Sequence, residues 1–296
     1  MGASMAAFMS LRPNIIGMRR FFRPSRPAED HHPDAPGQSA APPASLPPPS
    51  PSADPFRDRR IPPGKRIYAI GDIHGCADPF ERLIDMIARD ARGLSCRETA
   101  IVLLGDLVDR GPDSARVLDL VKLLQDSALE VHAIMGNHEE VLLELLDHPT
   151  EEVARFFARI GGRETLASYG VALPGSGDET HAIIEGVGAI PAEHRALLRG
   201  LCACAEFGDM FFTHAGIDPA LALGDQDAAT MRWIREPFIG SQQRFEKLVV
   251  HGHTITPAID LAPGRVGIDT GAFRTGVLTA LVLEDDRHWS LQTGIA

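Results

Sequence analysis

The chain has 296 residues, of which 44% are hydrophobic, so it is long and apolar enough for a sizeable buried core. Residues 65–296 carry 21 basic and 35 acidic residues, a net charge of −14, which excludes general nucleic-acid binding through clustered Lys and Arg. No apolar run approaches the roughly 18 residues that a membrane helix needs. With four cysteines and no Cys-x-x-Cys pair, we expect a cytoplasmic protein with reduced thiols and no membrane span.

Residues 1–64 differ in composition from the rest of the chain, since they hold 14 of the 23 prolines. A segment rich in Pro, Ala and Ser has little apolar surface to bury, so it should stay extended and disordered. We therefore predict a disordered Pro-rich tail over residues 1–64 and one catalytic domain over residues 65–296. The tail has two interpretations, a solvated linker or a docking segment for partners.

The first half of the predicted domain repeats one pattern three times: a buried strand, a polar cluster and a helical periodicity. Strands over residues 66–70, 99–104 and 131–135 are followed by three polar clusters, Asp72-Ile73-His74, Asp106-Leu107-Val108-Asp109-Arg110 and Asn137-His138-Glu139. Strands with helical crossovers form a sheet whose ligands bind beyond the carboxyl ends of the strands. The clusters can therefore converge in space, although they are far apart in sequence.

The second half predicts another sheet, packed on the first. Strands over residues 209–213 and 248–250 lead to His214 and His253, and three more strands are expected between residues 266 and 292. Residues 151–203 are mostly helical in pattern, and we expect them to form a cap or rim. The fold class is therefore α/β.

The polar clusters supply a set of metal-ligating side chains. The candidates are Asp72, His74, Asp106, Asn137, His214 and His253. Their carboxylate, amide and imidazole groups, without a thiolate, suit Mn²⁺, with Fe or Zn²⁺ as alternatives. Two such cations can share a bridging carboxylate and a bridging hydroxide, and they can clamp the oxygens of an in-line displacement. Alone, each motif has an ordinary interpretation as a turn or a helix start; their common place at strand ends favours one site.

These motifs resemble the signature set of a known enzyme family. The matching segments are Gly71-Asp72-Ile73-His74-Gly75, Gly105-Asp106-Leu107-Val108-Asp109-Arg110-Gly111, Gly136-Asn137-His138-Glu139, His214-Ala215-Gly216 and Gly252-His253-Thr254. They resemble the PPP-type metallophosphatases of the calcineurin-like phosphoesterase superfamily, and look closest to the bacterial and lambda-phage serine/threonine protein phosphatases. The resemblance implies a four-layer αββα sandwich with two packed mixed sheets flanked by helices. It also implies a dinuclear-metal phosphomonoester hydrolase that uses a metal-bridging hydroxide.

The resemblance implies a role for each matching residue. Asp72 and His74 would hold one metal, Asp106 would bridge, and Asn137, His214 and His253 would hold the other. His138 would protonate the leaving group, with Asp109 fixing its tautomer. Arg110, Asn137 and Arg235 would bind the phosphoryl group, with Arg232 as a competitor for the place of Arg235. His251 would lie next to the ligands without being one.

The function has three interpretations at this stage. The expected substrate is a phosphoprotein or a phosphorylated small molecule. Asp109 before Arg110 and Glu139 after His138 favour a serine/threonine phosphoprotein phosphatase over the alternative, a symmetrical bis(5'-nucleosyl)-tetraphosphatase or broad-specificity phosphoesterase. A non-catalytic metal-binding interaction module is a minor alternative, because no ligand, acid or arginine is missing from the set.

Overall fold

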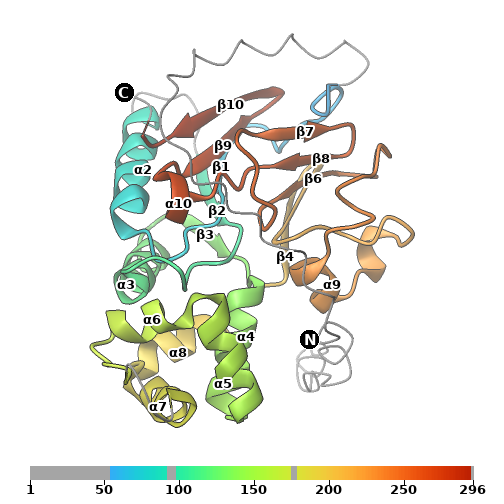
Figure 1. Ribbon diagram of the computed structural model, residues 1–296. Helices are drawn as coiled ribbons and strands as arrows, with labels where there is room; N and C mark the ends of the chain where they lie inside the picture. The colour runs from blue at the N-terminus through green and yellow to red at the C-terminus, as the bar shows by residue number, and fades with distance from the viewer. Residues whose placement is uncertain (1–53, 92–97, 175–178, 295–296) are drawn as a thin grey trace, which may run out of the picture. The chain divides into compact units, whose positions relative to one another are not determined.

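Two five-stranded sheets form the centre of the computed structural model, which describes residues 54–91, 98–174 and 179–294. The first sheet has the strand order β10-β9-β1-β2-β3 (Figure 1). Its strands are β1 (Lys65–Ile70), β2 (Glu98–Leu103), β3 (Glu130–Ala133), β9 (Thr279–Glu284) and β10 (Arg287–Gln292). Strands β1, β2 and β3 are parallel, whereas β9 is antiparallel to β1 and β10 to β9, so the sheet is mixed, as predicted.

The second sheet has the order β4-β5-β6-β8-β7. Its strands are β4 (Cys204–Phe207), β5 (Met210–Thr213), β6 (Leu248–His251), β7 (Asp260–Ala262) and β8 (Arg265–Gly267). Strands β5, β6 and β8 are parallel, and the outer strands β4 and β7 pair antiparallel with β5 and β8. This sheet is therefore mixed as well, and it presents the carboxyl ends of three parallel strands at one edge.

One hydrophobic core joins the two sheets. Alternate residues of both sheets meet in it, among them Ile67 and Ala69 of β1 and Leu248 and Val250 of β6. Because side chains along a strand point alternately to opposite faces, this alternation shows that the two sheets pack face to face. The buried area of these apolar side chains is the main force that holds the sheets together.

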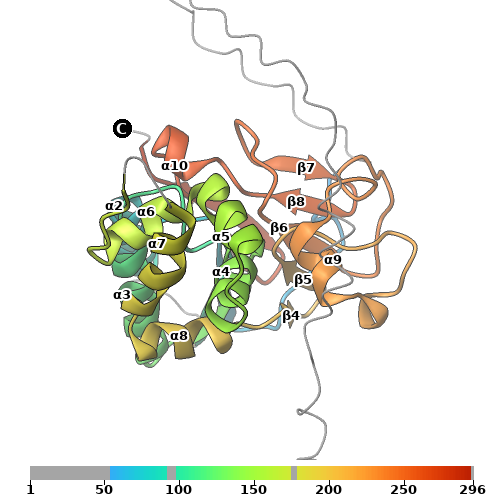
Figure 2. The same cartoon turned by 60° about the horizontal axis from the view of Figure 1, so that its bottom comes forward.

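Helices flank the two sheets, and some of them form the outer two of the four predicted layers. They are α2 (Ala77–Asp90), α3 (Ser114–Gln125), α4 (Asn137–Asp147), α5 (Glu151–Phe157), α6 (Arg163–Ser168), α7 (Glu179–Gly186), α8 (Ala192–Arg199), α9 (Ala228–Trp233) and α10 (Ala272–Thr275). Helices α2 and α3 lie beside the first sheet, and α9 lies beside the second (Figures 1 and 2). On the outer face of the second sheet, Met231 of α9 packs with Phe211 and Val249. The predicted αββα sandwich is therefore confirmed.

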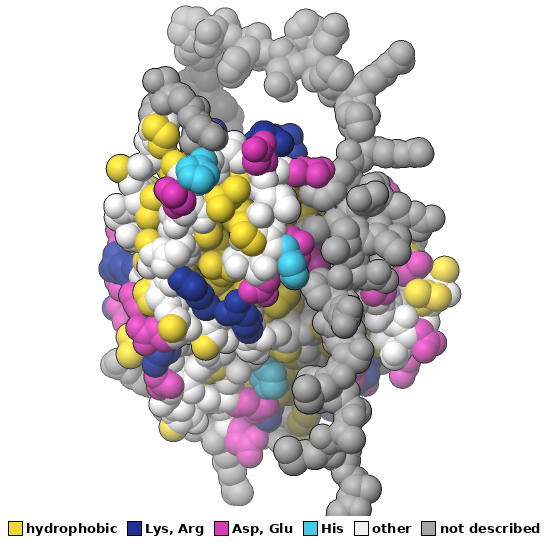
Figure 3. All heavy atoms as spheres, turned by 90° about the horizontal axis from the view of Figure 1, so that it is seen from below, with side chains coloured by type: hydrophobic (Ala, Val, Ile, Leu, Met, Phe, Trp, Pro, Cys, Tyr) yellow, Lys and Arg dark blue, Asp and Glu magenta, His cyan; other side chains and the backbone are white. Residues whose placement is uncertain are grey.

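Helices α5 to α8 gather at one end of the domain, below the first sheet in Figure 1. They occupy most of the segment over residues 151–203 that the sequence predicts to be a helical cap. The face seen from below mixes hydrophobic, acidic and basic side chains over its visible part (Figure 3). In the described part of the chain, no helix is long and apolar enough to cross a membrane.

The folded part begins earlier than the predicted boundary at Lys65. Phe56 and Ile61 are 7% and 4% exposed and belong to the core between the sheets. The backbone N–H of Ile61 donates to the carbonyl of Asp285, at 3.1 Å. Residues 54–64 are thus part of the domain, because their two apolar side chains find a place in its core. Residues 1–53 lie outside the described residues, and the disordered tail stays a prediction for them.

Candidate metal centre

The six predicted ligands all follow strands and converge at one edge of the two sheets. Asp72 and His74 follow β1, Asp106 follows β2, and Asn137 begins α4 after β3; in the second sheet, His214 follows β5 and His253 follows β6. All six side chains are buried, with at most 8% of any of them exposed. The structure therefore brings together in space what the sequence places up to 181 positions apart.

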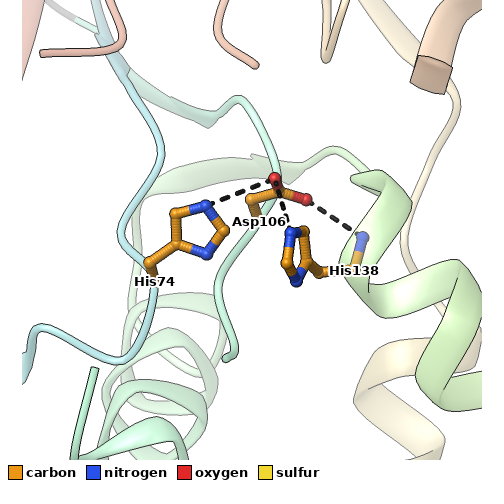
Figure 4. A group of neighbouring side chains, drawn as sticks. All are labelled: His74, Asp106 and His138. Atoms are coloured by element: carbon orange, nitrogen blue, oxygen red, sulfur yellow. Dashed lines mark hydrogen bonds and ion pairs between the residues drawn. The ribbon is translucent and has the colours of Figure 1, made fainter. Parts of the chain in front are cut away.

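Two groups of side chains could each hold a metal ion, and they share Asp106. One group is His74, Asp106 and His138; the other is Asp106, His214 and His253. Figure 4 shows both rings of the first group directed at the Asp106 carboxylate, with His74 Nε2 3.5 Å and His138 Nε2 3.8 Å from Oδ2. His214 Nε2 lies 3.4 Å from the other oxygen, Oδ1. A carboxylate that faces one group with each oxygen is suited to bridge two cations.

Backbone carbonyls fix the orientation of two of these imidazoles. His74 Nδ1 lies 2.9 Å from the carbonyl of Val108, and His214 Nδ1 lies 2.9 Å from that of Leu104. A carbonyl only accepts, so both Nδ1 atoms donate, and in the neutral rings both Nε2 atoms keep a free lone pair. Each Nε2 lies within 3.5 Å of the Asp106 carboxylate, and a ring protonated on Nδ1 is the tautomer that metal ligation through Nε2 requires.

The second group is a cluster of acceptors. His214 Nε2 lies 3.0 Å from Asn137 Oδ1 and 3.1 Å from His253 Nδ1, in addition to Asp106. Buried acceptors this close together repel unless a proton or a cation lies among them. Burial alone would lower the pKa of His214. The charge of Asp106, together with the hydrogen bonds of His214 to Asp106 and to the carbonyl of Leu104, outweighs burial and raises this pKa. The donor set of imidazole, amide and carboxylate groups therefore fits a divalent transition metal.

Asp72 lies where negative charge is poorly compensated. Its carboxylate accepts from the backbone N–H of His253, at 3.0 Å. Burial, together with the charges of Asp269 and Asp106, raises the pKa of Asp72 well above its usual range. The strand-end glycines allow these close approaches, since a Cβ on Gly252 would lie 2.0 Å from the Asp72 carboxylate.

Backbone strain is concentrated at the site. Of the seven non-glycine residues with positive φ in the described part of the chain, five are predicted site residues: His74, Asp106, Asp109, Arg110 and His253. A left-handed conformation costs a non-glycine residue roughly 1–3 kcal/mol and persists only where the surroundings hold it. Such strain typically clusters at functional sites.

Asp109 and His138 form a hydrogen-bonded pair. Asp109 Oδ2 lies 2.7 Å from His138 Nδ1. Its other oxygen accepts from the hydroxyl of Thr165 on α6, at 2.6 Å, and its backbone N–H donates to Ser114 and Thr165. Burial would lower the pKa of His138, but the charge of Asp106 and the bond to Asp109 outweigh burial and raise it. Thr165 is a contribution of the cap that the sequence analysis did not identify.

Arg110 reaches across the first group. Its guanidinium donates to His74 Nε2 at 2.9 Å and to His138 Nε2 at 3.0 Å. The guanidinium also lies 4.8 Å from the ring centroid of Phe273 in α10, a cation–π distance. The backbone N–H of Arg110 donates to Gly161 of the cap, at 3.0 Å. The cap and α10 thus hold the arginine at the metal centre from two sides.

Comparison with known proteins agrees with this geometry. A family model for calcineurin-like phosphoesterases matches residues 65–265, which is more than half of the chain. The chain belongs to the calcineurin-like phosphoesterase family. With its two buried His/Asp groups, it is a metal-dependent phosphoesterase and hence a hydrolase.

Two relatives match this phosphoesterase over nearly the whole of their own length. The symmetrical bis(5'-nucleosyl)-tetraphosphatase of Nitrosospira multiformis is 26% identical over 281 residues, which cover 77% of this chain and 96% of that protein. The enzyme of the same name from Aromatoleum aromaticum is 27% identical over 277 residues, with 77% and 97% covered. A solved structure of a candidate diadenosine tetraphosphatase has a TM-score of 0.56 at 21% identity and covers 79% of this chain and 98% of that one, a likeness in fold.

The two candidate phosphate-binding arginines of the phosphoesterase differ in their surroundings. Arg235 is exposed and donates to the carbonyl of His253, at 3.3 Å, so it lies at the rim of the metal centre. Arg232 instead pairs with Glu140 at 2.6 Å, and only 14% of its side chain is exposed. Because a carboxylate already compensates Arg232, Arg235 is the better placed of the two.

Three other residues lie near the metal centre of the phosphoesterase without being candidate ligands. The Glu139 carboxylate accepts from the backbone N–H groups of residues 106, 107, 108 and 136, which ties the second strand-end loop to the start of α4. His251 is buried and bonds through Nδ1 to the carbonyl of Gly252, at 3.0 Å. Burial raises the pKa of the Cys76 thiol to about 11, so Cys76 is a packing residue rather than a reactive thiol.

Proposed function

We propose that this phosphoesterase is a symmetrical bis(5'-nucleosyl)-tetraphosphatase, which splits a dinucleoside tetraphosphate into two nucleoside diphosphates. The proposal is carried by the two relatives of that name, which match over 77% of this chain and at least 96% of their own length. It replaces the serine/threonine phosphatase that the motifs alone favoured, and the bond cleaved is a phosphoanhydride rather than a phosphomonoester. The geometry of the metal centre is compatible with either bond, because both reactions attack a phosphoryl group.

In this proposal, the predicted ligands divide around the shared carboxylate. Asp72 and His74 would hold one cation, Asp106 would be shared, and Asn137, His214 and His253 would hold the other. Two divalent cations, when bound, activate water and offset the negative charge of the phosphoryl oxygens. His138 completes the first geometric group, but Asp109 fixes its Nδ1. Because that bond suits a ligand through Nε2 as well as a proton donor, we assign His138 to proton transfer on its place in the segment Gly136-Asn137-His138-Glu139.

The remaining residues act on the substrate. Arg110 and Arg235 bind phosphoryl oxygens, with the Asn137 amide beside them, since planar guanidinium groups match those oxygens with two parallel hydrogen bonds. These arginines are needed because the net charge of −14 over residues 65–296 opposes the approach of a polyphosphate. His138, whose pKa is raised, can carry the proton that the leaving oxygen takes up.

One observation favours the second candidate, a serine/threonine phosphoprotein phosphatase. A nucleoside diphosphate leaves readily as an anion, whereas a serine alkoxide is a poor leaving group that requires a proton. The buried pair of Asp109 and His138, held by Thr165, has the arrangement of a general acid that can supply that proton. General acid catalysis by this pair would raise the rate most in an enzyme that cleaves phosphomonoesters of alcohols.

A side-by-side rate comparison tests the proposal. The purified protein with added Mn²⁺ is given diadenosine tetraphosphate or a phosphoserine peptide, and kcat/KM is measured for each. The proposal predicts faster turnover of the tetraphosphate, with ADP as the only nucleotide product by chromatography. Products of AMP and ATP would contradict the symmetrical cleavage, and a higher kcat/KM on the peptide would favour the second candidate.

A further inference from the structure

Asp269 is a buried carboxylate at the metal centre to which no role is assigned above. It follows β8 and is 2% exposed. Its Oδ1 accepts from the backbone N–H of Gly271, at 2.9 Å, whereas Oδ2 is buried without a hydrogen-bond partner. The backbone of residues 268–269 packs directly on Gly71, because a Cβ on Gly71 would lie 2.6 Å from the Ile268 carbonyl. Asp269 therefore lies beside the strand end that carries Asp72.

Asp269 adds to a concentration of negative charge. After burial, the charge of Asp269 is the strongest influence that raises the pKa of Asp72. The pKa of Asp269 is itself raised, by burial first and also by Asp106. Among the ion pairs formed by the described residues, none involves Asp72 or Asp269, so no Lys or Arg directly compensates either carboxylate. Asp72, Asp106 and Asp269 are thus three buried carboxylates that follow three strand ends, and the charge of Asp106 acts on both of the others.

An unpartnered carboxylate oxygen in the interior is costly to the fold, by several kcal/mol for an uncompensated ion. It is compatible with a stable protein when a cation provides the missing charge. We infer that Asp269 is a third carboxylate of the metal centre, whose free oxygen stabilises the cation held by Asp72 and His74. The inference depends on the dinuclear centre of the proposed function, but not on the substrate proposed for it.

The variant Asp269→Asn tests this role without changing the shape of the side chain. The amide keeps an oxygen for the N–H of Gly271 and removes the charge. Groups that support metal ligands from outside typically change metal affinity by roughly 10–100-fold when they are replaced. We therefore expect Mn²⁺ binding to one of the two positions to weaken about 10–100-fold, as measured by isothermal titration calorimetry together with the metal content after dialysis.

The melting temperature of the metal-free protein gives a second measurement, and its rise on adding Mn²⁺ distinguishes the two roles. After chelator treatment, Asp269→Asn should melt at the same or a higher temperature than the wild type, because repulsion with Asp72 and Asp106 is relieved. The rise in melting temperature on adding Mn²⁺ should be smaller in the variant. If Asp269 merely shaped the turn to Gly271, the variant, which keeps that hydrogen bond, would melt as the wild type does without metal and would bind Mn²⁺ with the same affinity.

Glu284→Gln is a matched control. Glu284 is also buried, but it pairs with Arg66 at the opposite end of β1 from the metal centre. This control should lose stability and keep its Mn²⁺ affinity. Equal Mn²⁺ affinity in Asp269→Asn and the wild type would overturn the inference and leave the proposed function intact. A wild type that binds no Mn²⁺, Fe or Zn²⁺ would instead overturn the dinuclear centre itself.

Discussion

Replacing His138 with Asn separates two roles that the geometry of the first group allows. His138 is 1% exposed, bonds to Asp109 at 2.7 Å and lies 3.8 Å from the Asp106 carboxylate. If it protonates the leaving group, its loss should lower kcat by roughly 10²–10⁴-fold, or about 3–5 kcal/mol of activation free energy. If it is a metal ligand, its loss should lower the metal content as well.

We expect His138→Asn to keep two metal ions per chain while kcat falls. The loss should be largest on a phosphoserine peptide and smallest on para-nitrophenyl phosphate, whose leaving group needs little protonation. Metal content would be measured by mass spectrometry of the dialysed protein, and kcat on each substrate at saturating Mn²⁺. His251→Asn is a control, because His251 is a buried histidine of β6 that bonds only to a backbone carbonyl.

Two results would refute this reasoning. Loss of one metal ion from His138→Asn would make His138 a ligand. An equal loss of kcat on every substrate, irrespective of the leaving group, would exclude general acid catalysis. In the first case the bond to Asp109 would serve to orient a ligand instead of a proton donor.

Three further predictions concern the cap, the pH dependence of stability and the amino-terminal segment. Thr165→Val removes the hydroxyl that holds Asp109, so kcat should fall by roughly 10–100-fold with unchanged metal content; an unchanged kcat would show that this hydroxyl plays no part in the reaction. Burial lowers the pKa of His251 from 6.5 to about 4, so this residue makes the folded state lose stability, about 3 kcal/mol in all, as the pH falls from 6.5 toward 4. Urea unfolding of the metal-free protein at pH 7 and pH 5 should therefore show a smaller acid loss in His251→Asn than in the wild type, and equal losses would contradict the assignment. Deleting residues 1–53 should leave the melting temperature unchanged, whereas deleting residues 1–64 removes two buried apolar side chains and should cost about 3–6 kcal/mol; calorimetry that shows equal stability for both deletions would rule out a structural role for the segment between them.

The fold and the convergence of the candidate metal ligands could be predicted because their signals are local in sequence. Asp72, Asp106 and His214 each come directly after an apolar run, and parallel strands end at a common edge. Asp269 has the same signal, since it ends the apolar run after β8 and precedes Thr270-Gly271. The sequence pattern nevertheless predicts it as part of a strand, because no partner motif surrounds it in the sequence.

Other parts of the site depend on contacts that no short segment contains. The hydroxyl of Thr165 reaches Asp109 across 56 positions, and the ring of Phe273 lies over the guanidinium of Arg110 across 163 positions (273 − 110). Threonine and phenylalanine occur in most helices, so neither position differs in sequence from ordinary packing. The substrate cannot be predicted from these residues, because the candidate ligands and arginines would interact with a phosphoryl group whatever molecule carries it.

In the proposed mechanism, the bond between Thr165 and Asp109 makes the cap part of the chemistry. The metal ligands belong to the two sheets, whereas the hydroxyl that fixes the proton-transfer pair belongs to a cap helix. The carbonyl that receives the backbone N–H of Arg110 also belongs to the cap. A cap transplanted from another phosphoesterase would therefore change proton delivery and phosphate binding while leaving metal loading alone. For protein engineers, the cap offers a way to adjust the rate of the reaction independently of its metals.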